Sequence, residues 1–262
     1  QSGVDKTKFT LTMTTNATKT SVPANYNITY SVSNSNYTVS NSSVGVYTIN
    51  KRPITITATK QTGVYGSNVN LNQTQYQITT FETGKQGIVN NDDVKIVLST
   101  SVNGSSAVNT YSKAIKVSVS GEHLNHYNVT VVNGDLEITK RPITITALPH
   151  TSTYGDAIDV SKFVYSVTSA LSPAIVNSDV LNVNLSTLAT STSNTGDYDI
   201  EVDCTSNNYN ITLVDSTLRI TKRDIAILIL DQSGIFKEAI NLQHDKFVIN
   251  NLANSDNLSI QL

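Results

Sequence analysis

The sequence predicts an all-β protein in which small β-sandwich or β-grasp-like domains follow one another in an elongated array. Three observations carry this prediction: a ten-residue segment recurs three times, apolar and polar residues alternate along most of the chain, and no flexible linker separates the recurring segments. Alternation with a period of two puts successive side chains on opposite faces of a strand. Helical turns are expected only near residues 158–162 and 237–240.

The recurring segment contains a Lys-Arg pair followed by an alternating strand. It reads Ile-Asn-Lys-Arg-Pro-Ile-Thr-Ile-Thr-Ala at residues 49–58, returns almost unchanged at 138–147, and returns with more apolar residues at 220–229. Tyrosines and Asn/Asp/Ser-rich turns recur in step with it, and Asp93, Asp179 and Asp256 close three of these turns. Self-similarity at a period of this length indicates tandem copies of one small domain.

These offsets divide the chain into four parts, whose names are kept below. Residues 1–50 are the N-terminal half-repeat and match the second half of a unit, residues 51–139 are the first repeat, residues 140–221 are the second repeat, and residues 222–262 are the C-terminal half-repeat and match a first half. Two interpretations stay open. Either the folded domains are offset from the sequence repeat, as 1–88, 89–175 and 176–262, or the repeats belong to a larger array.

Six strands are expected in each complete repeat. Ile54, Ile56 and Ala58 alternate with threonines, so the isoleucines should face a core and the threonines water. In the second repeat the other strands are expected at residues 163–167, 181–185, 198–202, 209–213 and 218–220. Asn133-Gly134 predicts a type I′ hairpin, because both central residues of that turn need a positive φ. Residues 136–147 read as nearly continuous extended chain, so neighbouring units should have a restricted angle.

Composition excludes several classes of protein. The net charge is −2, so no basic excess exists to neutralise the phosphates of a nucleic acid. No apolar run approaches 18 residues, so no membrane insertion is expected, and the first residues lack the pattern of a signal peptide. A single Cys permits no internal disulfide. The 35 Thr and 29 Asn residues predict a polar, uncharged surface.

No catalytic or cofactor-binding residue is predicted, because no Ser-His-Asp order, phosphate loop or acidic pair occurs in a recognisable context. Cys204 occupies the position of Val32 in the repeat and is expected in the core rather than as a nucleophile. The four histidines fall at unrelated repeat positions and are expected to be incidental surface residues; they are His123, His126, His150 and His244.

Asn91, Asp92 and Asp93 are weak calcium candidates, because calcium takes several oxygen ligands. The simpler interpretation is that Asn and Asp satisfy their own backbone in turns, and no metal is expected. The Lys of each Lys-Arg pair could form an isopeptide crosslink to an Asn if it were buried. An exposed charge that discourages edge pairing is the simpler role.

A family resemblance follows from the order of short motifs in the second repeat. Tyr154-Gly155-Asp156 is followed by Asn177-Ser178-Asp179, by Thr195-Gly196-Asp197-Tyr198, by Asn208-Tyr209 and by Leu218-Arg219-Ile220-Thr221. This order resembles the YGX-type MBG repeats of bacterial surface adhesins, and the Lys-Arg-Pro strand looks like the form found in lactobacillar mucus-binding proteins. The resemblance implies tandem β domains on a secreted, wall-anchored protein and no catalytic residues.

Some positions depart from the family pattern. Tyr65-Gly66-Ser67 lacks the acidic third residue, and in the C-terminal half-repeat Ser233-Gly234-Ile235 stands near the Tyr-Gly position. The function expected is attachment to host mucin or to epithelial surface glycans or proteins. A passive stalk and an accessory region of a secreted enzyme are the alternatives. Most tyrosines lie in strand alternation and should point inward, among them Tyr127, Tyr198 and Tyr209.

The strand of the C-terminal half-repeat should be covered on both faces. Ile225, Ile227 and Ile229 align with the inward set of the first repeat, while Leu228 and Leu230 replace outward threonines. Burial of a leucine contributes about 1.5–3 kcal/mol, so two exposed leucines would forfeit a sizeable term. We therefore expect either a second apolar layer or a partner chain over this strand.

Overall fold

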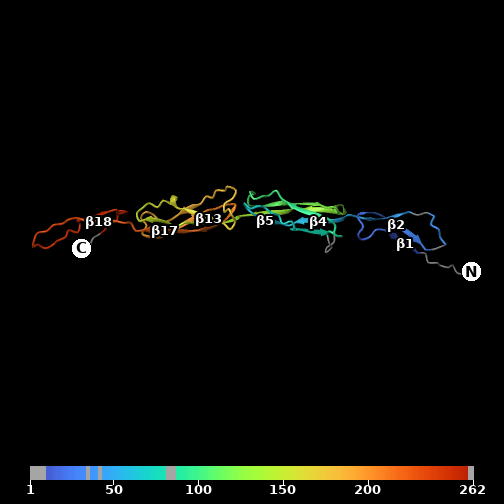
Figure 1. Ribbon diagram of the computed structural model, residues 1–262, viewed down its shortest axis with the longest axis horizontal. Coiled ribbons are helices and arrows are strands. Elements are labelled where there is room, and N and C mark those ends of the chain that lie inside the picture. The colour runs from blue at the N-terminus through green and yellow to red at the C-terminus, as the bar shows by residue number, and fades with distance from the viewer. Residues whose placement is uncertain (1–9, 34–35, 41–42, 81–86, 259–262) are drawn as a thin grey trace. The chain divides into compact units, whose positions relative to one another are not determined.

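The computed structural model describes residues 10–33, 36–40, 43–80 and 87–258. Nineteen strands and two single 3₁₀ turns, η1 (Leu124–His126) and η2 (Val160–Lys162), account for the regular structure of these residues (Figure 1). The chain divides into two compact units. The N-terminal unit holds residues 1–63 and 67–138, and the C-terminal unit holds residues 64–66 and 139–262.

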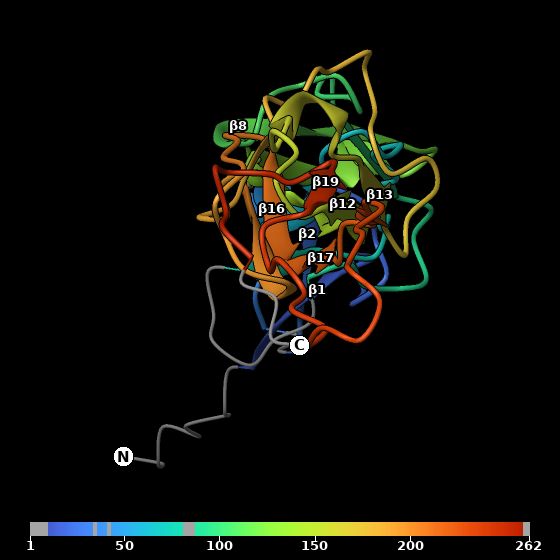
Figure 2. The ribbon, with the colours of Figure 1, turned by 90° about the vertical axis from the view of Figure 1, so that its left-hand side faces the viewer.

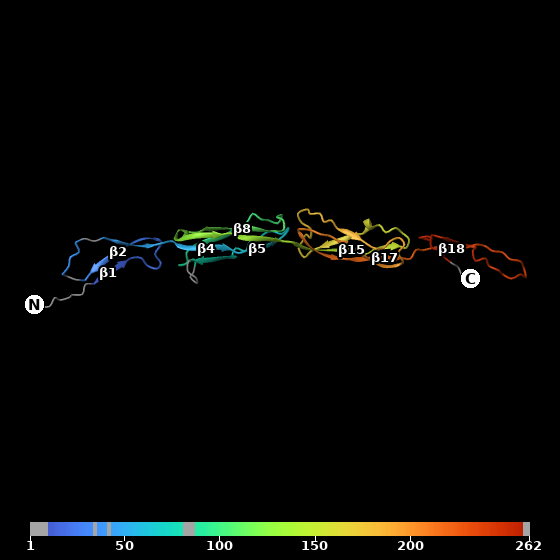
Figure 3. The same cartoon turned by 180° about the vertical axis from the view of Figure 1, so that it is seen from behind.

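Two sheets build the first repeat. In the smaller sheet, β4 (Arg52–Ala58) lies between an antiparallel neighbour, β6 (Tyr76–Thr80), and a parallel neighbour, β9 (Tyr127–Val132). The larger sheet has the order β5 (Gln61–Val64), β10 (Gly134–Thr139), β8 (Asn109–Ser120) and β7 (Lys95–Ser99). Figure 3 shows β4, β5 and β8 from the side opposite to that of Figure 1.

The second repeat has the same topology. In its smaller sheet, β11 (Arg141–Ala147) lies between β13 (Tyr165–Thr168) and β16 (Tyr209–Val214). Its larger sheet has the order β12 (His150–Thr153), β17 (Ser216–Thr221), β15 (Gly196–Asp203) and β14 (Asn184–Ser186); β12, β13, β16 and β17 are labelled in Figure 2. Seven strands rather than six therefore make one repeat. The strand that the sequence analysis missed is β5 in the first repeat and β12 in the second. Both are short and polar, and their residues show no apolar alternation.

The core of the first repeat lies between its two sheets. Ile54, Ile56 and Tyr127 of the smaller sheet pack against Ile96 and Val117 of the larger one. The prediction of an all-β chain of small domains is confirmed, and the two-sheet arrangement is that of a β-sandwich. The described residues contain no helix longer than a single turn to serve as the helix of a β-grasp fold.

The hairpin predicted at Asn133-Gly134 is wrong. Strands β9 and β10, which flank this pair, belong to different sheets, and neither residue has a positive φ. The chain crosses between the sheets here, because β9 pairs with β4 while β10 pairs with β8. Gly134 is required for close approach, since a Cβ on it would lie 2.8 Å from the carbonyl oxygen of Ala58.

Among the described residues, the half-repeats contain counterparts of five of the seven strands of a complete repeat. In the N-terminal half-repeat, β1 (Leu11–Thr15), β2 (Ala24–Val32) and β3 (Gly45–Ile49) form one antiparallel sheet, as β7, β8 and β10 do. In the C-terminal half-repeat, β18 (Ala226–Ile229) pairs with β19 (Phe247–Asn250), as β4 pairs with β6.

No second apolar layer covers β18 within the described residues, so this alternative of the prediction is wrong, while cover by a partner chain stays a prediction. Every residue of β18 is exposed, and Ile227 and Leu228 are 50% and 58% exposed. The physical reason is the half-repeat itself. In a complete repeat the parallel neighbour of this strand and three of the four strands of the facing sheet come from the second half.

Candidate functional site

A buried arginine organises the start of the second repeat. Arg141 is only 1% exposed. Its Nε donates to the carbonyl oxygen of Ala174 at 3.2 Å, its Nη2 donates to that of Pro173 at 2.6 Å, and its Nη1 donates to that of Tyr65 at 3.3 Å. The rigid fork of a guanidinium can satisfy several carbonyls that a lysine could not. Arg141 thus ties three backbone segments together in the C-terminal unit.

Tyr209 and Val176 complete this arrangement. The amide of Val176 donates to the Tyr209 hydroxyl at 3.0 Å, and burial raises the pKa of that hydroxyl. The Tyr65 ring packs edge-on against the Tyr209 ring, with centroids 5.7 Å apart. Gly66 has a φ of +74°, and a Cβ on it would lie 2.1 Å from Val176 Cγ2. We call Arg141, Val176 and Tyr209 a socket, and its occupant is the Tyr65-Gly66 turn.

The C-terminal half-repeat carries a second occupied socket. Arg223 Nε donates to the carbonyl oxygen of Tyr154 at 2.7 Å, and Arg223 Nη2 pairs with the Asp156 carboxylate. Gly155 has a φ of +85°, and a Cβ on it would lie 2.2 Å from the Cβ of Ala253. The same two contacts therefore recur: an arginine donates to the tyrosine carbonyl, and an apolar side chain lies against the glycine.

The first repeat carries the corresponding residues beside an open cavity. Arg52 Nε donates to the carbonyl oxygen of Gly87 at 3.1 Å, and the amide of Val89 donates to the Tyr127 hydroxyl at 3.0 Å. A cavity of about 360 Å³ lies next to these three side chains and is also bordered by residues 19–23. We call this third arrangement the Arg52 socket.

The Asn/Asp-rich turns close these sockets. In residues 89–92, 176–179 and 253–256 both central residues have a φ between +52° and +59°. The amide of the fourth residue donates to the carbonyl of the first at 2.9–3.0 Å in each. Asn is expected at such positions because it tolerates a positive φ, and Asn fills four of the six. The structure corrects one equivalence: Asp92, not Asp93, matches Asp179 and Asp256.

The calcium candidates bond to neighbouring protein groups. The Asp92 carboxylate accepts from the Tyr127 hydroxyl at 2.9 Å and lies 3.1 Å from His126 Nδ1, while the Asp93 amide donates to His123 Nδ1 at 2.9 Å. Asn91 supplies a central residue of the turn. No group of three His, Cys, Asp or Glu that could hold a metal occurs in the part of the chain that the structure describes. His123 and His126 are not incidental surface residues, since they tie this turn to the loop before β9.

Removal of divalent metal should leave stability unchanged, because tight calcium binding needs several carboxylates and Asp92 already bonds to Tyr127 and His126. We expect the melting temperature in EDTA to equal that in calcium. A fall of several degrees in EDTA would show that residues 91–93 hold a metal.

Acid should weaken the N-terminal unit through Asp92. Burial raises the pKa of this carboxyl, but hydrogen bonds from His126 and Tyr127 and the nearby histidine charges outweigh it, so that the pKa is lowered. A lowered folded-state pKa gives stability that is present above the unfolded value, about 3.9, and is lost as the pH falls through the folded value. Urea unfolding between pH 5 and pH 2.5 should show this loss. Asp92→Asn should flatten the acid limb, and equal acid limbs in both proteins would exclude Asp92 as its source.

The remaining candidate site residues lie at positions that fit an inert role. Cys204 is buried, as the repeat predicts, and burial raises the pKa of its thiol. A thiol with a raised pKa is a poor nucleophile. Lys51, Lys140 and Lys222 are exposed, and Lys140 Nζ donates to the carbonyl oxygen of Ser206 at 3.0 Å.

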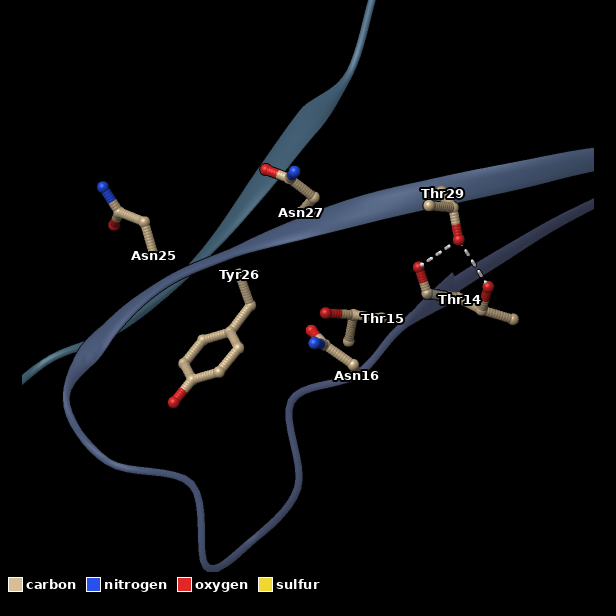
Figure 4. Close-up of a pocket in the computed structure, with 7 residues that line it drawn as sticks. All are labelled: Thr14, Thr15, Asn16, Asn25, Tyr26, Asn27 and Thr29. Carbon is tan, nitrogen blue, oxygen red and sulfur yellow. Dashed lines mark hydrogen bonds between the residues drawn. The ribbon is translucent and has the colours of Figure 1, made fainter.

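An open polar groove lies on the N-terminal half-repeat (Figure 4). It encloses about 730 Å³ and is lined by six hydroxyl or amide side chains and one tyrosine: Thr14, Thr15, Asn16, Asn25, Tyr26, Asn27 and Thr29. The Asn25 and Asn27 side chains point to the opposite side of β2 from the Tyr26 ring (Figure 4). The Tyr26 hydroxyl donates to the carbonyl oxygen of Val22 at 2.8 Å, which fixes the ring. We call this the N-terminal groove.

Comparison with known proteins identifies the repeats. A family model described as the MBG domain (YGX type) matches residues 54–137 and 143–219, which together are more than half of the chain. The chain belongs to the MBG domain family. The suspected resemblance is thereby confirmed, with two MBG repeats in tandem. No curated protein matches the chain.

The Tyr-Gly pair in the description YGX is the turn that occupies two of the sockets, as Tyr65-Gly66 and as Tyr154-Gly155. Membership is consistent with a repeat segment of a surface protein, and this is not an enzymatic family. No helix in the described ranges is long and apolar enough to cross a membrane. Sequence reasoning missed the role of the arginine of each Lys-Arg pair, although its recurrence at the start of each repeat was a signal for it.

In the C-terminal half-repeat the Tyr-Gly position is Phe236-Lys237 rather than Ser233-Gly234. Phe236 lies 13 residues after Arg223, as Tyr65 lies after Arg52. Lys237 has a φ of +70°, close to the +74° of Gly66, and the amide of Glu238 donates to the carbonyl oxygen of Ile235, as that of Asp156 does to Thr153. The turn geometry is therefore kept with a phenylalanine and a lysine in it.

Proposed function

We propose that the chain is a repeat segment of an extracellular bacterial surface adhesin and that it contacts host mucin or epithelial surface glycans. Family membership supports the surface location, since MBG repeats are typical of surface proteins. The observation that carries direct contact is the N-terminal groove, which six hydroxyl or amide side chains and one tyrosine line.

The chemistry of this groove suits a carbohydrate. Sugar hydroxyls need both donors and acceptors, and the amides of Asn25 and Asn27 offer both. Tyr26 offers an amphipathic ring whose hydroxyl is already held by Val22. No charged side chain lines the groove, so the ligand should be a neutral glycan whose binding depends little on salt.

The test is a titration of mucin O-glycans into the full chain, in which the NMR chemical shifts of the protein's amide groups report binding. Asn25→Ala with Asn27→Ala should remove the binding shifts, because it deletes both amides while leaving the Tyr26 hydroxyl bond to Val22. Asn210→Ala, an exposed change in β16, is the matched control and should bind as the parent does. Equal binding by the double variant would exclude the groove.

A spacer that projects a separate binding domain is the second candidate. The observation that favours it is the use of tyrosine hydroxyls for internal bonds. Tyr111 and Tyr198 each donate to the carbonyl oxygen four residues earlier, as Tyr26 does, and Tyr127 and Tyr209 are buried. A spacer would bind none of the glycans in the same titration, and its Asn25 and Asn27 amides would show no shifts.

A further inference from the structure

We propose that Asn103 is a site of covalent self-modification, at which the chain converts this asparagine into aspartate or isoaspartate and releases ammonia. The reaction takes water as its substrate and needs no cofactor. It requires an unhindered backbone nitrogen after the asparagine and donors that stabilise negative charge on the side-chain oxygen. Two asparagines of the sequence precede a glycine, and both stand in the same tripeptide Val-Asn-Gly, as Asn103 and as Asn133. The structure distinguishes them.

The turn of residues 103–106, in the loop between β7 and β8, supplies two donors to the side-chain carbonyl. Asn103 Oδ1 accepts from the Ser105 amide at 3.0 Å and from the Ser105 hydroxyl at 2.7 Å. The Ser106 amide closes the turn by donating to the carbonyl oxygen of Asn103 at 3.0 Å. Donors that already point at an oxygen on which charge develops stabilise the transition state. The two Ser105 groups therefore form a small oxyanion site around Oδ1.

Ring closure is the first step of the reaction. The backbone nitrogen of Gly104 loses its proton to hydroxide and attacks Cγ of Asn103, so that a C–N bond forms and the negative charge moves to Oδ1. The bond from Cγ to Nδ2 then breaks, and Nδ2 takes a proton from water and leaves as ammonia. Nucleophile and carbonyl belong to neighbouring residues, so the step is intramolecular. Its product is a five-membered cyclic imide.

Water opens the imide in the second step. If water adds at Cγ, the bond from Cγ to the Gly104 nitrogen breaks, the nitrogen regains its proton, and aspartate results. If water adds at the main-chain carbonyl of residue 103, the other C–N bond of the ring breaks and isoaspartate results. The whole sequence consumes water, releases ammonia and changes no oxidation state. Either product adds one negative charge to a chain whose net charge is −2.

Asn133 has the glycine but no room to react. Gly134 is buried, and a Cβ on it would lie 2.8 Å from the carbonyl oxygen of Ala58. Asn133 Oδ1 accepts from the Val117 amide at 3.2 Å, which holds the side chain against β8. Asn103, in contrast, is exposed. The backbone at Asn133 is thus packed where the chain crosses between the sheets, and hydroxide does not reach it.

Asn72 has the donors but no glycine. Its Oδ1 accepts from the Thr74 amide at 3.0 Å and from the Thr74 hydroxyl at 2.8 Å, as Asn103 does from Ser105. The next residue is Gln73, whose side chain exchanges two hydrogen bonds with the backbone of Leu98. A side chain fixed in this way hinders the approach of its own backbone nitrogen to Cγ. Asn103 combines the two features that Asn72 and Asn133 have singly.

The aspartate product fits the turn in which it forms. In the second repeat Asp159 begins a turn of the same kind, and its Oδ1 accepts from the Ser161 amide at 3.1 Å and from the Ser161 hydroxyl at 2.6 Å. A carboxylate at position 103 can therefore keep both Ser105 bonds. In isoaspartate the main chain runs through the side chain and is longer by one CH₂ group. It should displace Val102, which packs against the core cluster that contains Leu98.

The test is incubation of the folded full chain at mildly alkaline pH, followed by tryptic digestion and mass spectrometry. Asn72, Asn103 and Asn133 fall on different tryptic peptides, residues 61–85, 96–113 and 117–140. Conversion raises the mass of a peptide by about 1 Da, fragment ions assign the residue, and chromatography separates aspartate from isoaspartate. We expect Asn103 to convert at least about tenfold faster than Asn72 and Asn133.

One variant and one solvent condition separate the turn from the tripeptide. Ser105→Ala removes the hydroxyl donor, keeps the amide donor, and should slow conversion of Asn103 about tenfold in the folded chain. Ser101→Ala, an exposed change in the same loop, is the matched control and should convert as the parent does. In the urea-unfolded chain Asn103 and Asn133 should convert at equal rates, because their tripeptides are identical, and Ser105→Ala should have no effect.

Three results would overturn the proposal. Conversion of Asn103 in the folded chain as slow as that of Asn133 would mean that the turn does not permit ring closure. Conversion of Asn72 as fast as that of Asn103 would mean that the glycine is not required. An unchanged rate in folded Ser105→Ala would show that the hydroxyl of Ser105 takes no part in the reaction.

Discussion

Arg141→Met is expected to lower the free energy of unfolding of the C-terminal unit by about 3–5 kcal/mol, one of the largest effects available to a single change in this chain. The side chain is almost fully buried and donates to the carbonyl oxygens of Tyr65, Pro173 and Ala174. Methionine fills a similar length but leaves these acceptors without their donor. A buried acceptor that loses its partner costs about 1–3 kcal/mol.

Urea unfolding measures this loss. The slope of the unfolding free energy against urea concentration should be compared between parent and variant. Arg219→Met is the matched control, because the Arg219 side chain is 70% exposed and its Nη1 lies 3.9 Å from Asp197, so the change should stay within about 0.5 kcal/mol. Arg141→Lys should recover little, since an ammonium group lacks the guanidinium fork. A loss under about 1 kcal/mol in Arg141→Met would show that water replaces the lost donors.

The sequence predicted the features that depend on local pattern. Alternating residues placed Ile54, Ile56 and Ala58 in the core, where the structure has them. The turn-forming Asn and Asp residues were also predicted, because a positive φ is a local requirement. Both features follow from the preference of a residue for one backbone conformation or one side of a strand.

The sequence failed where distant segments decide the outcome. Charged residues are rarely buried, so a Lys-Arg pair indicates solvent exposure on both residues. Lys140 is exposed, but Arg141 is buried because carbonyls from Tyr65, 76 residues earlier, and from Pro173 converge on it. No pattern around residue 141 reveals that convergence.

The hairpin predicted at Asn133-Gly134 failed for a related reason. The dipeptide is a strong hairpin signal only when the two flanking strands pair with each other. Here β9 finds its partner in β4, and β10 finds its partners in β5 and β8, so the same two residues carry the chain from one sheet to the other. The glycine is needed for the nearby carbonyl oxygen of Ala58 rather than for a turn.

Gly66→Ala is expected to destabilise the C-terminal unit by about 2–4 kcal/mol, from two separate costs. The first is the left-handed backbone, with a φ of +74°, which costs a non-glycine residue about 1–2 kcal/mol. The second is steric, because the new Cβ would lie 2.1 Å from Val176 Cγ2. Lys237 shows that a side chain can occupy the same backbone conformation at a position where the turn is not buried.

A double-mutant cycle with Val176→Ala separates the two costs. Removing the valine methyl groups should relieve the contacts with Cγ1 and Cγ2 and keep the 2.6 Å contact with the Cβ of residue 176, so the double variant should be more stable than the sum of the single changes predicts, by about 1–2 kcal/mol. Gly234→Ala is the control, since no atom lies within 4 Å of a Cβ there, and it should change stability by less than about 0.5 kcal/mol. If the two changes are additive, the methyl groups of Val176 contribute nothing to the cost. The Tyr65-Gly66 turn would then be held by Arg141 and Tyr209 without close contact to those methyl groups.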